Sequence, residues 1–87
     1  MRFPLGQTVI ARSARDVLWN GDVLRALARH ASGDWGELSA EDWRANDDAL
    51  NTEARLLSAY QSSDGVKFWI ITEADRSVTT VLLPEEY

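Results

Sequence analysis

Hydrophobic residues recur at a helical spacing in the first half of the chain and alternate with polar residues in the last third. The first half begins with a short apolar run, Thr8–Ala11, whose β-branched residues predict a strand. Ser13 followed by Asp16 has the pattern of a capping box, which predicts a short helix over residues 14–19.

Two longer helices are predicted after this segment. The first, which Asn20 can cap, carries an apolar stripe at helical spacing: Val23, Leu24, Leu27 and Ala31. Gly33 stands where a left-handed residue usually ends a helix. Ser39 followed by Asp42 is a second capping-box pattern and predicts a helix over Ala40–Asn51. The apolar stripe of this last helix is thin, so most of its surface should face water.

The last third of the chain predicts an antiparallel sheet. Three runs there are rich in β-branched and aromatic residues: Ala54–Gln61, Val66–Thr72 and Ser77–Pro84. Ser62–Gly65 predicts the first turn because glycine tolerates a positive φ, and Glu73–Arg76 predicts the second. We therefore expect an α+β fold in one domain, residues 1–87, with two to three N-terminal helices packed on a small antiparallel meander of three or four strands. The middle strand is apolar on both faces, so the face without helices needs another cover.

Composition narrows the class of protein. The chain has 87 residues and no cysteine, which fits one domain in a reducing cytoplasm and excludes a disulfide or a thiolate metal site. No apolar run approaches the ~18 residues that span a bilayer, and the start lacks the apolar core of a secretory signal. We expect a cytoplasmic monomer or homodimer without a membrane partner.

Catalytic and metal-binding patterns are missing from the sequence. His30 is the single histidine, and although Asp34 and Glu37 are near it, a metal site needs more ligands at suitable spacing. A position near a helix end, where the dipole favours a cation, explains His30 better. No serine lies in a nucleophile elbow, and no glycine-rich loop is suited to phosphate. We therefore expect no catalytic residue, no cofactor and no metal.

Negative charge is concentrated in one segment. Residues 1–33 carry five arginines and two aspartates, whereas residues 34–53 carry seven acidic residues and one arginine. Such a surface repels a phosphate backbone, so no direct nucleic-acid partner is expected, and it attracts a basic protein. Two interpretations remain open: a solvated helix face that aids solubility, and a partner-binding surface. The candidate partner-binding residues are Asp34, Trp35, Glu37, Glu41, Asp42, Asp47 and Asp48.

The choice between a solvated face and a partner-binding surface depends most on three residues of this segment: Trp35, Asp47 and Asp48. Trp35 lies between an aspartate and a glycine in a predicted loop, so it is either an exposed interface aromatic or a side chain tucked over the helix junction. Asp47 and Asp48 are adjacent near the C-terminal end of their helix, where the dipole disfavours them.

Two stretches, HASGDWGELSAEDWRAND (residues 30–47) and residues 55–87, resemble a family of short bacterial, plasmid and phage proteins. The matching positions are Gly33–Gly36, Glu41, Asp42, Asn46, Trp69–Glu73, Asp75, Arg76, Thr79, Thr80, Pro84 and Tyr87. Members often carry the label "plasmid-related protein" or "type I restriction endonuclease subunit M". The second label does not suit this chain, which has no cofactor-binding glycine motif and no methyltransferase catalytic motif.

This resemblance implies an origin on mobile elements, whose small acidic proteins often inhibit host defence, as anti-CRISPR and anti-restriction proteins do. The expected function is therefore a non-enzymatic inhibitor that blocks a basic nucleic-acid-binding surface, such as that of a CRISPR effector. The alternative is a structural or regulatory accessory protein that self-associates through its open sheet face and has no defence role.

Overall fold

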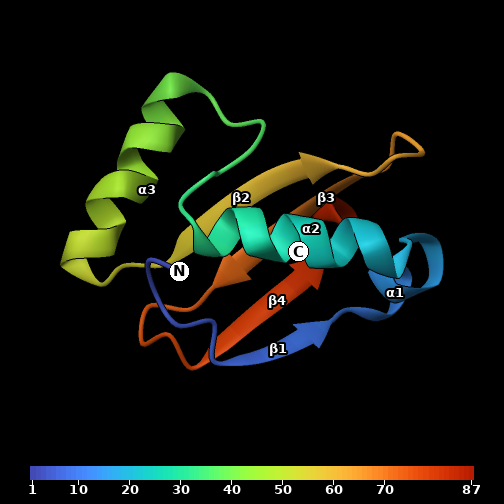
Figure 1. The fold of residues 1–87 in the computed structure, drawn as a ribbon, viewed down its shortest axis with the longest axis horizontal. Coiled ribbons are helices and arrows are strands. Elements are labelled where there is room, and N and C mark those ends of the chain that lie inside the picture. The colour runs from blue at the N-terminus through green and yellow to red at the C-terminus, as the bar shows by residue number, and fades with distance from the viewer.

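The protein contains a four-stranded sheet with the order β1-β4-β3-β2 (Figure 1). Its strands are Gln7–Ile10 (β1), Leu56–Gln61 (β2), Lys67–Thr72 (β3) and Val78–Leu82 (β4). The computed structural model describes residues 1–87. Strands β2, β3 and β4 form the predicted antiparallel meander, which confirms the α+β class. Strand β1 pairs parallel with β4, so the expectation of an entirely antiparallel sheet is wrong. An isolated apolar run carries no information about its partner or its direction, and that explains the error.

Three α-helices separate β1 from the meander. They are Arg12–Val17 (α1), Asn20–Ala31 (α2) and Ala40–Thr52 (α3), and a 3₁₀ turn, Pro84–Glu86 (η1), follows β4. Helix α2 runs across one face of the sheet, whereas α3 lies beyond the edge formed by β2 (Figure 1). No helix is both long and apolar enough to cross a lipid bilayer.

The two predicted capping boxes have different outcomes. The Ser39 side chain accepts a hydrogen bond from the backbone of Asp42 at 3.1 Å, which confirms the start of α3. Helix α1 has no such local cap. Instead the carboxylate of Glu86 accepts hydrogen bonds from the backbone N–H groups of Ser13 and Ala14 at 2.8 and 3.1 Å. A carboxylate at a helix start stabilises the unpaired N–H groups there, so the C-terminal turn supplies the cap.

The core lies between the sheet and helices α1 and α2. Its buried members alternate along the strands and recur along the helices: Ala14, Leu18, Val23, Ala26, Tyr60, Phe68, Ile70, Val81 and Leu83. A second, smaller cluster lies under α3 and is formed by Phe3, Trp35, Ala49 and Leu56. This second cluster joins the N-terminal segment to α3, and it fixes a helix that carries four acidic residues.

The opposite face of the sheet has no helical cover. Trp69 points to this face, because Phe68 and Ile70 point into the core. The ring of the C-terminal Tyr87 packs edge-on against Trp69, with 5.7 Å between centroids. The hydroxyl of Tyr87 accepts a hydrogen bond from Arg55 at 2.6 Å, and Arg55 also pairs with Glu73. The C-terminus therefore covers part of the apolar face, and Trp69 stays half-buried.

The edge of the sheet at β2 is covered by the chain that leads into α3. Ala59 donates to the carbonyl of Trp35 at 3.1 Å and accepts from the N–H of Glu37 at 2.7 Å. Between them Gly36 has φ 77°, and a Cβ at this position would collide with the carbonyl oxygen of Ala59. A glycine is therefore required for this close approach. This contact places the start of the acidic segment against the sheet.

Candidate functional site

Helix α3 is anchored on one side by two polar side chains. The amide of Asn46 donates to the carbonyl of Leu57 at 2.6 Å and accepts from its N–H at 3.2 Å, so it satisfies both backbone groups of this edge residue. At the other end of the helix, Arg76 donates to the carbonyls of Ala49 and Ala54 at 3.1 and 2.7 Å. Ala49 is in the last turn of α3 and Ala54 lies just after the helix, so a cation interacts with carbonyls at the helix C-terminus. Asn46 and Arg76 thus position the helix, roles that sequence reasoning missed.

Trp35 cannot form a partner-binding contact, because the structure buries it completely. Its exposed fraction is 0%, and its ring packs against those of Phe3 and His30, with centroid distances of 6.1 and 5.6 Å. The indole N–H donates to the Asp47 carboxylate at 2.9 Å. The expectation of an exposed interface aromatic is therefore wrong, and the alternative of a side chain tucked over the helix junction is right. A buried indole N–H needs an acceptor, which explains why an aspartate lies opposite.

Asp34 is on the surface, but an arginine balances its charge. Arg29 donates to both carboxylate oxygens of Asp34, at 2.7 and 3.2 Å, and the N–H of Gly36 adds a third hydrogen bond at 3.2 Å. The hydrogen bond from Arg29 lowers the pKa of Asp34 below its ordinary value. Asp34 therefore contributes little to an anionic surface, and its contacts hold the loop between α2 and α3.

The other five candidates remain exposed and lack an ion-pair partner. We call them the acidic surface: Glu37, Glu41, Asp42, Asp47 and Asp48. The three ion pairs of the protein lie elsewhere, at Arg25–Asp22, Arg29–Asp34 and Arg55–Glu73. Arg44, on the same helix, is exposed and makes no ion pair. The acidic surface is therefore not neutralised by contacts within the protein.

Four carboxylates of the acidic surface are distributed around α3, and the fifth, Glu37, lies in the loop before it. With about 100° of rotation per residue, Glu41 and Asp48 share the side opposite Asn46, with Arg44 between them along the helix. Asp42 and Asp47 lie on opposite flanks of the helix. Asp47 also accepts the hydrogen bond from Trp35, so its place near the unfavourable end of the helix has a structural cause. Asp48 has no such contact.

His30 lies in the interior, at the centre of a chain of hydrogen bonds. It is 0% exposed, and its Nδ1 and Nε2 atoms lie 2.5 and 2.8 Å from the hydroxyls of Ser58 and Thr72. Burial, followed by the charge of Arg76, lowers the pKa of His30 to about 4. The imidazole is therefore neutral near pH 7, and the expectation of a cation favoured by the helix dipole is wrong. Both ring nitrogens are occupied by hydroxyls rather than by carboxylates.

The donor and the acceptor of each hydrogen bond in this network can be assigned from its last acceptor, the carbonyl of Leu5. Thr79 donates to the carbonyl of Leu5 at 2.6 Å, so it must accept from Thr72, whose hydroxyl lies 2.7 Å away. Thr72 then has no proton left for the ring, so Nε2 of His30 carries the proton and Nδ1 accepts from Ser58. Every buried side-chain nitrogen and oxygen in the protein has a partner. The network specifies the packing of α2 against the sheet.

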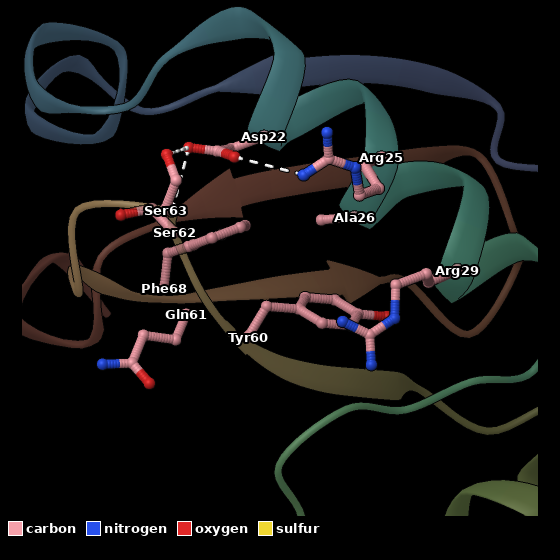
Figure 2. Close-up of a pocket in the computed structure, with 9 residues that line it drawn as sticks. All are labelled: Asp22, Arg25, Ala26, Arg29, Tyr60, Gln61, Ser62, Ser63 and Phe68. Carbon is pink, nitrogen blue, oxygen red and sulfur yellow. Dashed lines mark hydrogen bonds and ion pairs between the residues drawn. The ribbon is translucent and has the colours of Figure 1, made fainter.

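A polar pocket of about 160 Å³ lies between α2 and the β2–β3 hairpin (Figure 2). At its upper end Asp22 accepts hydrogen bonds from the N–H and hydroxyl of Ser63, at 3.1 and 2.8 Å. At its other end the guanidinium of Arg29 lies 4.9 Å from the centroid of the Tyr60 ring. Burial raises the pKa of Tyr60 to about 12, so its hydroxyl stays protonated and donates to the carbonyl of Asp34. These groups are paired with one another, and they tie the hairpin and the α2–α3 loop to α2.

No group of three or more histidine, cysteine or acidic side chains lies close enough to hold a metal ion. The arrangement on α3 can instead offer several free carboxylates to a cationic surface. Neither protein-family models nor the curated proteins nor the solved structures gave a match to this chain, so the family resemblance stays an expectation from sequence.

Proposed function

We propose that the protein is a non-catalytic inhibitor that uses its acidic surface to block a basic, nucleic-acid-binding surface of a defence complex. The observation that carries the proposal is the set of five exposed carboxylates that have no cation partner. Surfaces that bind nucleic acid are rich in Lys and Arg, because phosphate neutralisation dominates their affinity. A protein that offers carboxylates to these side chains competes with the phosphates.

The anchoring of α3 supports this function. Asn46, Trp35 and Arg76 hold one side of the helix through hydrogen bonds, so the backbone that carries the carboxylates needs little ordering when a partner binds. The size of the surface limits the target. One helix of 13 residues cannot imitate a long duplex, but it can cover a short element such as the patch that reads a protospacer-adjacent motif.

Charge reversal tests the acidic surface. The triple substitution Glu41→Lys, Asp42→Lys and Asp48→Lys should weaken binding to the defence complex by at least about 100-fold, since each change replaces an attraction by a repulsion. It should also restore defence when the protein is expressed in hosts that carry a CRISPR or a restriction system. The measurement is the efficiency of plaque formation in each host, followed by a pull-down of the complex.

A matched control has the same change in net charge at other sites. Asp16, Asp64 and Glu85 are exposed and make no side-chain hydrogen bond or ion pair, so their replacement by lysine should leave inhibition intact. Circular dichroism checks that both variants fold. Full inhibition by a folded acidic-surface variant would refute the proposal, as would equal loss of inhibition in both variants.

Binding to the target should also depend steeply on salt. Exposed charges are screened within about 10 Å at 0.1 M salt and within about 3 Å at 1 M. We expect the Kd to rise by at least about tenfold between 0.05 M and 0.5 M NaCl, chiefly through slower association. Surface plasmon resonance gives both rate constants. A Kd that does not change over this range would exclude an electrostatic interface.

The alternative function, self-association through the open sheet face, is favoured by one observation. Trp69 stays half-buried on that face although Tyr87 and Arg55 pack beside it. Aromatic and arginine side chains are typical of interface hot spots. A salt-insensitive dimer that dissociates on Trp69→Ser would favour this alternative, because apolar contacts are little affected by screening.

A further inference from the structure

The two edges of the sheet are protected to very different extents. The β2 edge is covered by the loop around Gly36 and by the amide of Asn46. The β1 edge has the sequence Gln-Thr-Val-Ile, without a charge, a proline or a bulge, and three of its four residues are exposed. Native proteins usually protect an exposed edge with such features, because a bare edge pairs readily with another strand. The β1 edge is therefore a surface suited to strand pairing.

The outward hydrogen-bonding groups of β1 follow from its pairing with β4. The N–H groups of Gln7 and Ala11 donate to the carbonyls of Ser77 and Val81 at 2.9 and 2.8 Å. Odd-numbered residues of β1 thus direct their backbone groups toward β4. Because a parallel strand alternates, Thr8 and Ile10 direct their N–H and C=O groups away from the sheet. These four groups match the hydrogen-bonding pattern of a single added strand.

An uncharged groove runs beside this edge on the helical side. It has a volume of about 420 Å³ and is lined by Thr8, Ile10, Asn20, Val23, Leu24 and Leu27. Leu24 is 67% exposed, although it belongs to the apolar stripe of α2. The charged residues of α2 face away from this groove: Asp22, Arg25 and Arg29 line the polar pocket between α2 and the β2–β3 hairpin (Figure 2). Neither element bordering the groove therefore presents a charge that would repel a second identical surface.

We propose that β1 pairs antiparallel with β1 of a second copy of this chain, with the two-fold axis at Val9. In this register Thr8 lies opposite Ile10 of the second copy, and each of the two residues donates its N–H to the carbonyl of the other. By symmetry, Ile10 makes the same two hydrogen bonds with Thr8 of the second copy. Val9 then meets its own copy in a non-hydrogen-bonded pair, where side chains approach most closely. The result is a continuous eight-stranded sheet in which Thr8 and Ile10 of the second copy enter beside Leu24.

Charge complementarity at the ends of β1 favours a second copy as the occupant. Arg12 follows the C-terminal end of β1, is exposed and has no ion-pair partner. Asp75 is exposed in the turn before Ser77, whose carbonyl accepts from Gln7 at the N-terminal end of β1. Antiparallel pairing places Arg12 of each copy near the N-terminal end of β1 in the other copy, where Asp75 lies. The same pair of opposite charges therefore occurs twice, as a two-fold interface requires. The acidic surfaces stay apart, because α3 packs at the opposite edge, on β2.

Cysteine cross-linking tests both the interface and its register, and the chain has no cysteine of its own. With the axis at Val9, the two sulfurs of Val9→Cys face each other at a distance that a disulfide spans. The control is Gln7→Cys, on the same face of the same strand, whose two copies would be separated by about 13 Å along the strands. Under mild oxidation we expect Val9→Cys to form a covalent dimer at least about tenfold faster than Gln7→Cys, because pairing raises the effective thiol concentration. Equal rates would overturn the proposal.

Sedimentation equilibrium of the unmodified chain gives an independent test. We expect a monomer–dimer equilibrium, and we expect Thr8→Pro to raise its dissociation constant by at least about tenfold. Proline lacks the N–H that points away from the sheet at this position, but the hydrogen bonds between β1 and β4 are kept. The unfolding midpoint of Thr8→Pro at low concentration shows that the fold persists. Trp69→Ser should leave this dimer intact, which separates it from association through the open face. A chain that stays monomeric at every concentration, or a dimer lost with Trp69→Ser and kept with Thr8→Pro, would overturn the proposal.

Discussion

Replacing Trp35 with alanine is expected to lower the free energy of unfolding by about 3–5 kcal/mol, which is the range for a fully buried large aromatic. The substitution removes a ring that packs against both Phe3 and His30 and leaves a cavity under α3. Total stabilities of small domains are about 5–15 kcal/mol, so the variant should lose much of its stability. Urea unfolding followed by circular dichroism measures the change without relying on tryptophan fluorescence.

Trp19 provides a control of the same residue type. Its side chain is 64% exposed at the junction of α1 and α2. Replacement of an exposed side chain usually changes stability by less than about 0.5 kcal/mol. Similar losses for Trp19→Ala and Trp35→Ala would contradict the placement of Trp35 in the core. Because α3 packs on this indole, a partly folded Trp35→Ala should also lose protection of the α3 amides in hydrogen exchange.

Local signals allowed most of the fold to be predicted. The hairpin at Ser62–Gly65 was predictable because glycine suits the positive φ of the turn, and Gly65 has φ 87°. The start of α3 followed from Ser39 and Asp42, which are close enough in sequence to recognise each other. The pairing of β1 with β4 and the cap of α1 by Glu86 depend on residues that are about 70 positions apart. Contacts of that kind carry no local signature.

The candidate site was only partly predictable for the same reason. Exposure of Glu41 and Asp48 followed from helical rotation, whereas the fate of Trp35 depended on the Phe3 segment passing beneath α3. The pairing of Asp34 with Arg29 crosses the end of α2, where helical spacing rules stop. For His30 a usable signal did exist. Hydroxyl residues occupy inward positions on three strands, at Ser58, Thr72 and Thr79, and such residues in a core need a polar partner.

This buried network should make the protein sensitive to mild acid. The pKa of His30 is lowered from 6.5 to about 4, so between these values the unfolded chain binds a proton that the folded chain does not. Stability is therefore fully present above pH 6.5 and falls as the pH decreases to 4. The difference corresponds to a loss of about 3 kcal/mol. We expect this loss in urea unfolding at pH 7 and pH 4, and a midpoint near pH 4 for the His30 ring protons in NMR.

His30→Gln isolates the contribution of the imidazole, because glutamine has a polar side chain that does not titrate. The carboxylates of Asp34 and Glu86 have lowered pKa values, so their stabilising effect is lost as the pH falls below their ordinary values, in both proteins alike. The difference between wild type and His30→Gln should consequently shrink by about 3 kcal/mol from pH 7 to pH 4. Parallel pH profiles would mean that the imidazole has the same pKa in the folded and the unfolded chain, and so is protonated in the fold at little cost. In that case the Ser58 hydroxyl would have to turn and accept from Nδ1, and the chain of hydrogen bonds that ends at Leu5 would not fix the protonation state of the core.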